Sequence, residues 1–496
     1  MTTRGAIVLA ASLICAGMAT AGEITHPKAP GGVAERLDQI RAWLNEGRVG
    51  SARDTLDAIL TDNPDNVEIL YLRGQACLSR GEPKLLDIIA RLREFNATEY
   101  ADILQLKLLQ LLGDSEFESW AEHCVSMYPD SPEPAVSLWI YRQDHAAELA
   151  DTSELHRYGR EAILGAAPYL AAFCRAADIS YADGLYYLGM LHDKVPYRWG
   201  SYDQTFAARD RLGTTVEVEG ARELEYAECG SQMGVYFVDA NGNKLKMSLD
   251  TGTSGRGFTV HHDSVGDRLP GDTVLVIEDG IFYNYMTEPA DVVFKAVDFE
   301  RPMMSSFPVE YFQGGFTLAD GCFSPFALEG TAITIDPIRQ RAFVRDRDAM
   351  AQYRDSLSTD SAAFLPMVVR NSWPYVEVGI NGRRVLFMIE SGSRDVNVNE
   401  LAALHLGVRA YDSSLMWNGK EYPMRMFNDT VSVGGFEYEV IGGHVTERVM
   451  GNHNYGAASA GDIGPDFLRN FVWTIDPFRR ELILVESGAK AVSAEG

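Results

Sequence analysis

Two acidic residues stand at equivalent places in two copies of one sequence pattern. Asp250 follows the alternating apolar stretch 244–249, and Glu390 follows the apolar stretch 384–389 in the second copy. Glycines two residues after each acid let the backbone turn tightly. Two carboxyl groups that share one proton can hydrolyse a peptide bond: one takes a proton from water and the other donates one to the carbonyl oxygen. The apparent pKa values then belong to the pair.

Asp-Thr-Gly after a strand is by itself also an ordinary turn sequence. However, sliding the chain along itself until Asp250 lies on Glu390 aligns three further blocks. This offset places 241–242 (Asn-Gly) on 381–382, 321–328 on 461–468, and 334–339 (Thr-Ile-Asp-Pro-Ile-Arg) on 474–479 (Thr-Ile-Asp-Pro-Phe-Arg). Separated blocks at a single offset indicate a duplication, so we predict two homologous β lobes.

Each copy resembles one lobe of a retropepsin-like aspartic protease, of the pepsin and retropepsin clan, over residues 214–346 and 366–486. The resemblance implies two lobes fused in one chain as a pseudo-dimer, with Asp250 and Glu390 as the catalytic pair. It also implies that hydroxyls beside the acids brace the two loops, which gives the supporting residues Thr251, Gly252, Thr253, Ser391, Gly392 and Ser393. The second copy departs from the family pattern, because Glu390 stands where Asp is expected. Its extra methylene moves the carboxylate by about 1.5 Å.

Residues 273–285 form two β-rich runs around an Asp-Gly turn, which predicts a hairpin. In the family a hairpin at this point folds over the cleft as a flap. The resemblance therefore implies that Tyr283 and Tyr285 contact substrate. The alternative is that these tyrosines only pack the hairpin, since Tyr is common in strands.

Residues 30–195 have the apolar periodicity of helices and resemble tetratricopeptide repeats. Gly47, Ala52, Leu56 and Pro64 fall at the spacings of that repeat, and Gly81 follows Gly47 by one repeat period. The resemblance implies a helical solenoid with a concave face for a peptide or protein partner, although its apolar residues first form the stacking core. A polar, helix-prone connector, 347–365, joins the two lobes.

The first 21 residues have the pattern of an export signal: a basic start, an apolar run and a small-residue cleavage site at 19–21. We therefore expect a periplasmic or secreted protein that begins near Gly22, with no integral membrane span and a disordered tail at 487–496. The five remaining cysteines lack metal or disulfide spacing, and buried free thiols are expected for most of them: Cys77, Cys124, Cys174, Cys229 and Cys322.

The chain carries 44 basic and 70 acidic residues, a net charge of −26, which argues against nucleic acid or anionic membranes as partners. His261, His262 and Asp263 suggest a metal site, but surface histidines are favoured, because adjacent residues of a strand point to opposite faces and no Glu-x-x-His helix accompanies them. No metal or cofactor is expected. Asn96 and Asn428 begin glycosylation sequons, which matter only in a eukaryotic source.

The sequence thus predicts a multidomain α + β protein with a tetratricopeptide-like solenoid followed by two all-β lobes. The first functional hypothesis is an exported aspartic-type endopeptidase whose helical repeats dock a peptide or protein substrate or a partner. The second is a catalytically silent pseudoprotease that binds peptides in the same cleft. A third is scaffolding through the repeats alone.

Overall fold

The computed structural model describes most of the helical region and the framework of both lobes. The described residues are 33–45, 49–145, 215–230, 232–238, 244–252, 258–261, 273–278, 282–287, 298–300, 304–307, 319–325, 328, 330–370, 373–393, 396–417, 420–446 and 459–486. The predicted signal peptide 1–21, residues 146–195 of the predicted helical domain and the predicted tail 487–496 lie outside these ranges. No helix of the described residues is long and apolar enough to span a membrane.

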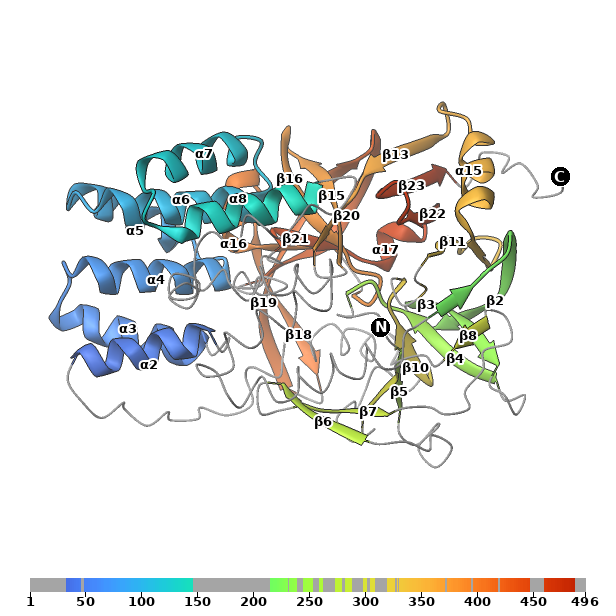
Figure 1. The fold of residues 1–496 in the computed structure, drawn as a ribbon, viewed down its shortest axis with the longest axis horizontal. Coiled ribbons are helices and arrows are strands. Elements are labelled where there is room, and N and C mark those ends of the chain that lie inside the picture. Colours follow the sequence, from blue (N-terminus) through green and yellow to red (C-terminus); the bar gives the residue numbers. More distant parts are fainter. Residues whose placement is uncertain are drawn as a thin grey trace.

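The helical region is a stack in which each helix packs on the next (Figure 1). Its helices are α2 (Val33–Asn45), α3 (Val49–Asp62), α4 (Val67–Arg80), α5 (Lys84–Glu94), α6 (Thr98–Leu112), α7 (Phe117–Met127) and α8 (Pro132–His145). Asn66 caps α4 by accepting hydrogen bonds from the backbone of Glu68 and Ile69. Gly81 and Gly113 end α4 and α6 in the left-handed conformation, which glycine adopts without strain. The arrangement is that of a helical solenoid.

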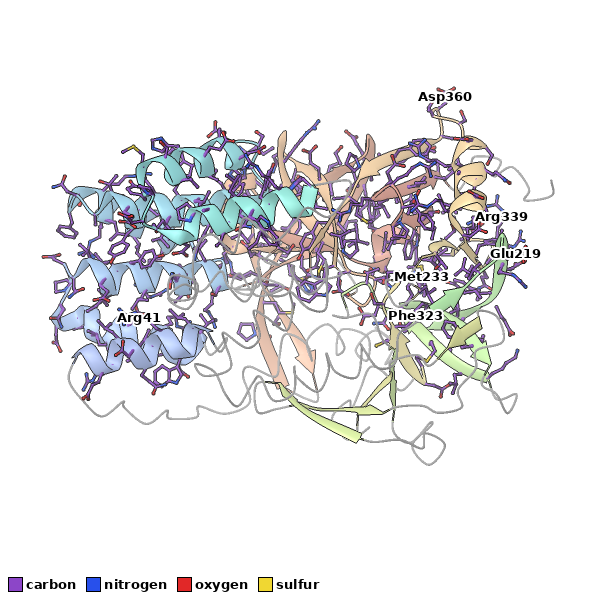
Figure 2. All side chains as sticks on the ribbon, in the orientation of Figure 1. Arg41, Glu219, Met233, Phe323, Arg339 and Asp360 are labelled. Carbon is purple, nitrogen blue, oxygen red and sulfur yellow. The ribbon has the colours of Figure 1, made fainter. Side chains whose placement is uncertain are left out.

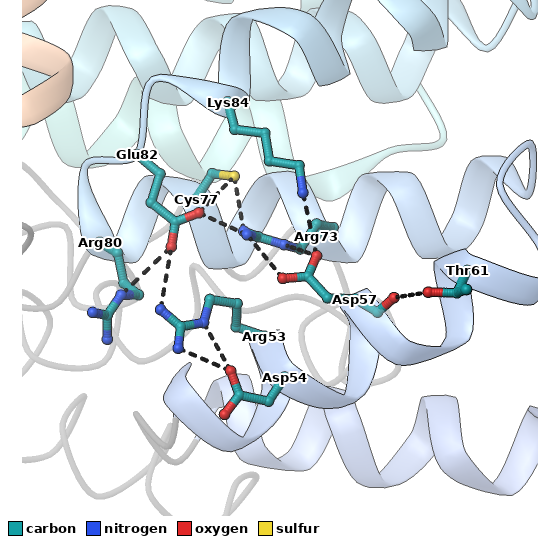
Figure 3. Close-up of polar contacts among 9 residues, drawn as sticks. All are labelled: Arg53, Asp54, Asp57, Thr61, Arg73, Cys77, Arg80, Glu82 and Lys84. Carbon is teal, nitrogen blue, oxygen red and sulfur yellow. Dashed lines mark hydrogen bonds and ion pairs between the residues drawn. The ribbon is translucent and has the colours of Figure 1, made fainter.

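A buried guanidinium ties the first helices together (Figure 3). Arg73 of α4 donates from Nε to Asp57 Oδ1 of α3 at 2.8 Å, and its Nη2 lies 2.7 Å from Glu82 Oε2 in the turn before α5. Its Nη1 donates to the Cys77 thiol at 3.0 Å. Burial raises the pKa of Cys77 to about 12, so this thiol stays protonated and unreactive.

All the cysteines within the described residues are buried, and none of them forms a disulfide: Cys77, Cys124, Cys229 and Cys322. This confirms the expectation of buried thiols for these positions, and Cys174 lies outside the described residues.

Lobe 1 is built from strands only, within the described residues. They are β1 (Thr215–Glu217), β2 (Ala221–Cys229), β3 (Gln232–Val238), β4 (Lys244–Leu249), β5 (Phe258–His261), β6 (Thr273–Glu278), β7 (Phe282–Thr287), β8 (Asp298–Glu300), β9 (Met304–Phe307), β10 (Gly321–Phe323), β11 (Ala332–Asp336) and β12 (Arg341–Arg345). β4 has the predicted bounds, and β6 and β7 pair as the predicted hairpin, with Ile277 opposite Tyr283. The apolar residues of β3, β4 and β10 form the lobe's interior, where Met233 and Phe323 are fully buried (Figure 2).

Lobe 2 repeats this order after helix α15 (Arg347–Asp355). Its elements are β13 (Ala362–Pro366), β14 (Val368–Arg370), β15 (Trp373–Ile380), β16 (Arg383–Ile389), β17 (Val396–Asn399), α16 (Glu400–Leu406), β18 (Tyr411–Trp417), β19 (Lys420–Val433), β20 (Phe436–Thr446), β21 (Gly461–Ile463), α17 (Pro465–Leu468), β22 (Phe471–Asp476) and β23 (Glu481–Glu486). Asn381 and Gly382 both have positive φ, as the Asn-Gly hairpin turn requires. The last residues of the predicted connector are not a linker, because β13 pairs with β23.

One sheet joins the lobes along the order β13-β23-β22-β11-β12-β2. At its centre β11 pairs with β22, with Thr334 opposite Thr474, and their hydroxyls are 2.8 Å apart. These two threonines are equivalent under the sequence duplication, so a pseudo-twofold axis passes between them. The repeated Ile-Asp-Pro motif has a structural reason: Asp336 accepts from the backbone of Arg339 at 2.9 Å, and Asp476 accepts from that of Arg479 at 3.2 Å.

The helical region and lobe 2 share one hydrophobic core. Leu401 N of α16 donates to the Gly81 carbonyl at 2.8 Å. A Cβ on Gly113 would lie 2.4 Å from Leu386 Cγ, so the turn after α6 sits directly on β16. The described helices are therefore packed directly on the lobe that carries Glu390.

Candidate active site

The two acids occupy equivalent places at the ends of two buried strands. β4 pairs in parallel with β10, and the Asp250 N–H donates to the Phe323 carbonyl at 3.0 Å. β16 pairs in parallel with β21, and the Glu390 N–H donates to the Ile463 carbonyl at 2.9 Å. Each acid is thus placed by the strand before it and by a second strand from the end of the same lobe.

The hydroxyls after the acids cross between the lobes. Thr251 Oγ1 donates to the Ile389 carbonyl at 2.5 Å and accepts from the Ser391 N–H at 2.8 Å. Ser391 Oγ donates to the Leu249 carbonyl at 2.8 Å and accepts from the Thr251 N–H at 3.0 Å. Thr251 and Ser391 are fully buried, so the four bonds lock the loops face to face.

Both carboxyls meet above the two glycines. Gly252 N–H donates to Asp250 Oδ1 at 3.0 Å, and Gly392 N–H donates to Glu390 Oε1 at 2.9 Å. A Cβ on Gly392 would lie 2.6 Å from Asp250 Oδ1, and one on Gly252 would lie 1.5 Å from Glu390 Oε2. The longer acid of lobe 2 therefore reaches across the axis into space that lobe 1 leaves open at Gly252.

Burial and neighbouring negative charges act on the carboxyl of Glu390. The pKa of Glu390 is raised well above its usual value, first by burial, then by the negative charge of Asp250 and of Asp462. Its carboxyl is also hydrogen-bonded to that of Asp250. The raised pKa favours the protonated form of Glu390.

A third carboxyl, Asp462 of β21, lies beside this pair. It is fully buried, and its Oδ1 accepts from Asn397 Nδ2 at 2.7 Å and from Ser393 Oγ at 3.1 Å. Its Oδ2 has no hydrogen-bond partner among the described residues. Burial raises the pKa of Asp462 to about 7, since two hydrogen bonds offset only part of the cost of removing the charge from water.

Asp462 was missed in the sequence, although the offset contains a signal for it. The equivalent position in lobe 1 is Cys322, so an acid stands in one copy where a thiol stands in the other. The backbone N–H of Ser393, expected as a support of the pair, donates to the Glu390 carbonyl at 3.1 Å, and its hydroxyl donates to Asp462.

Other predicted site residues are only partly placed. Tyr283 and Tyr285 lie on β7 of the hairpin, but their side chains are outside the described residues, and so is Thr253. His261 ends β5, whereas residues 262–263 are not described. Among the described residues there is no group of three His, Cys, Asp or Glu side chains that could hold a metal ion.

These features define a two-lobed fold that resembles pepsin-like aspartic proteases: a sheet shared across a pseudo-twofold axis, and two acid-bearing loops joined by crossed hydroxyls. Among solved structures, the chain is similar to basic 7S globulin from soybean, with 11% identity and a TM-score of 0.33, over 54% of this chain and 95% of that one. This likeness is too low to assign a function. No protein-family model and no curated protein matches the sequence.

Proposed function

We propose that the chain is an exported aspartic-type endopeptidase that cleaves peptide bonds with Asp250 and Glu390. The observation that carries the proposal is geometric: the crossed bonds of Thr251 and Ser391 hold the two acid-bearing loops face to face, with both carboxyls beside the two glycines. One proton on two acids is the state that activates a water and polarises a carbonyl together. The N-terminal helices, which we take as tetratricopeptide-like repeats, would hold a substrate or partner protein close to lobe 2.

In the proposed reaction Asp250 takes a proton from a water molecule, whose oxygen attacks the carbonyl carbon of the peptide. Glu390 donates its proton to the carbonyl oxygen, which gives a neutral tetrahedral diol. The diol then returns a proton to Glu390 as the carbonyl re-forms, Asp250 gives its proton to the leaving nitrogen, and the C–N bond breaks. The backbone N–H groups of Gly252 and Gly392, which bond to the two acids, hold each carboxyl in its orientation.

The expected pH dependence of the proteolytic activity follows from the raised pKa of Glu390. Glu390 must be protonated to donate, and its pKa is raised. Activity is therefore expected to be retained from acidic pH toward neutral pH and to be lost as pH rises through the pKa of Glu390.

The second candidate function is a peptide-binding module that does not cleave. It is favoured by one observation, the position of Glu390 Oε2 against Gly252, because a displacement of about 1 Å can cost about 10²-fold in rate. The experiment that separates the two incubates unfolded protein substrates with the wild type, Asp250→Asn and Glu390→Gln between pH 3 and 7.

The endopeptidase predicts cleavage by the wild type that both variants lose, with peptide binding retained. Cleavage that survives in Asp250→Asn excludes this pair as the catalytic centre. Peptide binding without cleavage by any of the three proteins establishes the binding module. Loss of binding and cleavage on removal of the helices, with the lobes still folded, supports their role in docking.

A further inference from the structure

A single glutamine links lobe 1 to the loop that carries Glu390. Gln232 begins β3, opposite Cys229 of β2, and its side chain is buried. Its Oε1 accepts a hydrogen bond from Ser248 Oγ at 2.6 Å, and its Nε2 donates to the Gly392 carbonyl at 2.6 Å. The oxygen of the side-chain amide is therefore hydrogen-bonded within lobe 1, and its nitrogen is hydrogen-bonded to lobe 2.

The hydrogen bond from Gln232 reaches Glu390 indirectly, because both side chains bond to the backbone of Gly392. Gly392 offers its carbonyl to Gln232 and its N–H to Glu390 Oε1, so the glutamine and the carboxyl hold the two polar groups of the same residue. Rotating the peptide plane after Gly392 would break the first bond, and rotating the plane before it would break the second. Gln232 thus limits how far the loop can tilt away from Asp250.

The crossed hydroxyls obey the pseudo-symmetry, but this link does not. The position equivalent to Ser248 in lobe 2 is Met388, which is buried and has no hydroxyl to anchor an amide. The position equivalent to Gln232 is Ser372, which carries no amide and lies outside the described residues. The additional brace therefore acts on the loop with the longer acid.

We propose that Gln232 is a positioning residue of the proposed reaction: anchored by Ser248, it holds the Gly392 loop so that the Glu390 carboxyl stays in register with Asp250. This inference rests on the endopeptidase function, but the register itself can be measured without turnover. If the loop tilts, the two carboxyls separate and their repulsion weakens, so the pKa of Glu390 falls.

The test compares three variants. Gln232→Leu removes both hydrogen bonds at similar size. Gln232→Glu keeps the acceptor for Ser248 but lacks the donor to Gly392 whenever the introduced carboxyl is ionised. Thr474→Val is the matched control, because it removes another buried hydrogen bond between the lobes, at the shared sheet and away from the acids.

The expected result has a kinetic part and a titration part. Gln232→Leu lowers kcat by about 10- to 100-fold with KM nearly unchanged, from the cost of a misplacement of up to about 1 Å. Gln232→Glu has the same defect near neutral pH and regains rate relative to wild type as pH falls, since its protonated carboxyl can donate to Gly392. In ¹³C-carboxyl NMR, with Glu390→Gln as the assignment reference, Gln232→Leu lowers the pKa of Glu390. Thr474→Val leaves the kinetic constants and this pKa unchanged.

Each possible outcome supports or overturns the positioning role of Gln232. Equal losses in Gln232→Leu and Thr474→Val, or an unchanged pKa of Glu390 in Gln232→Leu, overturn the positioning role. If the wild type does not cleave, the endopeptidase function fails, and the titration alone decides whether Gln232 sets the register of the pair. If Gln232→Leu does not fold, the pH-dependent recovery of Gln232→Glu decides, because a purely structural role predicts a constant ratio to wild type.

Discussion

Replacing Gly252 with alanine tests whether the longer acid of the pair fills space that lobe 1 leaves open. The added methyl would lie 1.5 Å from Glu390 Oε2 and 2.3 Å from its Cδ. The φ of Gly252 lies outside the left-handed region, so alanine meets no backbone strain there. Any cost of the substitution therefore reports the collision.

The magnitude follows from these distances. Real Cβ atoms essentially never approach another atom closer than 3.0 Å, so Glu390 Oε2 must retreat by about 1.5 Å. That distance is about one C–C bond, which is the length by which Glu exceeds Asp. We expect Gly252→Ala to cost about 1–3 kcal/mol of unfolding free energy, as overpacking of a tight site does. In the Glu390→Asp background the cost should fall below about 1 kcal/mol, since the oxygen is withdrawn.

The assay is a double-mutant cycle by urea unfolding of the wild type, the two single variants and the double variant. Far-UV circular dichroism and fluorescence should give coincident transitions if the unfolding is two-state. Gly50→Ala in α3 is the control, because a Cβ there meets nothing within 4 Å, and it should be neutral or stabilising by about 0.5–1 kcal/mol. The reasoning is refuted if Gly252→Ala costs the same in both backgrounds, or nothing in the wild type.

Three further predictions concern the surroundings of the pair. Because the pKa of Asp462 is raised to about 7 from 3.8, its protonated form stabilises the fold below pH 4 and this contribution is lost as pH rises to 7. Asp462→Asn should remove this loss of stability, which is about 4 kcal/mol at most, as urea unfolding at a series of pH values would show. It should also lower the pKa of Glu390, because the charge of Asp462 helps to raise it, and a carboxyl titration would measure that change. Thr251→Val leaves a buried N–H unpaired and should cost about 1–3 kcal/mol in urea unfolding, whereas Thr251→Ser should retain most of the stability. Gly113→Ala, at φ +68 and against Leu386, should speed hydrogen exchange at the contact of the helices with lobe 2; unchanged exchange there would contradict the close packing.

The duplicated framework could be predicted because its signals, a repeated motif order and an alternating apolar pattern, can be read directly from the sequence. The single offset between the two copies located both acids. The period-2 alternation of apolar residues predicted the bounds of β4 correctly. β2 escaped prediction, since its sequence Ala-Arg-Glu-Leu-Glu-Tyr-Ala-Glu-Cys places charged residues on the exposed face and buries few large apolar side chains. Its strand conformation comes from pairing with β12 and β3, which are distant or later in the chain.

The polar groups around Glu390 could not be predicted, because pairing between distant segments brings them together. Asp462 reaches the site through the parallel pairing of β21 with β16, where it lies opposite Met388. Gln232 reaches the Gly392 carbonyl from the other lobe, far away in the sequence. Gln232 belongs to none of the repeated blocks. Asp462 lies in the repeated block 461–468, but only the folded structure shows that it adjoins Glu390.

The departures from symmetry bear on whether the second acid is a relic or an adaptation. Where the two lobes contact each other through strand pairing and hydroxyl hydrogen bonds, equivalent residues are alike, as Thr334 and Thr474 are. Next to Glu390 they differ, and two of these differences add polar groups toward that acid: Asp462 stands where lobe 1 has Cys322, and the amide of Gln232 holds the Gly392 loop. Under the proposed endopeptidase function, Asp462 and Gln232 fit a cleft for an unequal pair, in which Glu390 is the acid and Asp250 the base.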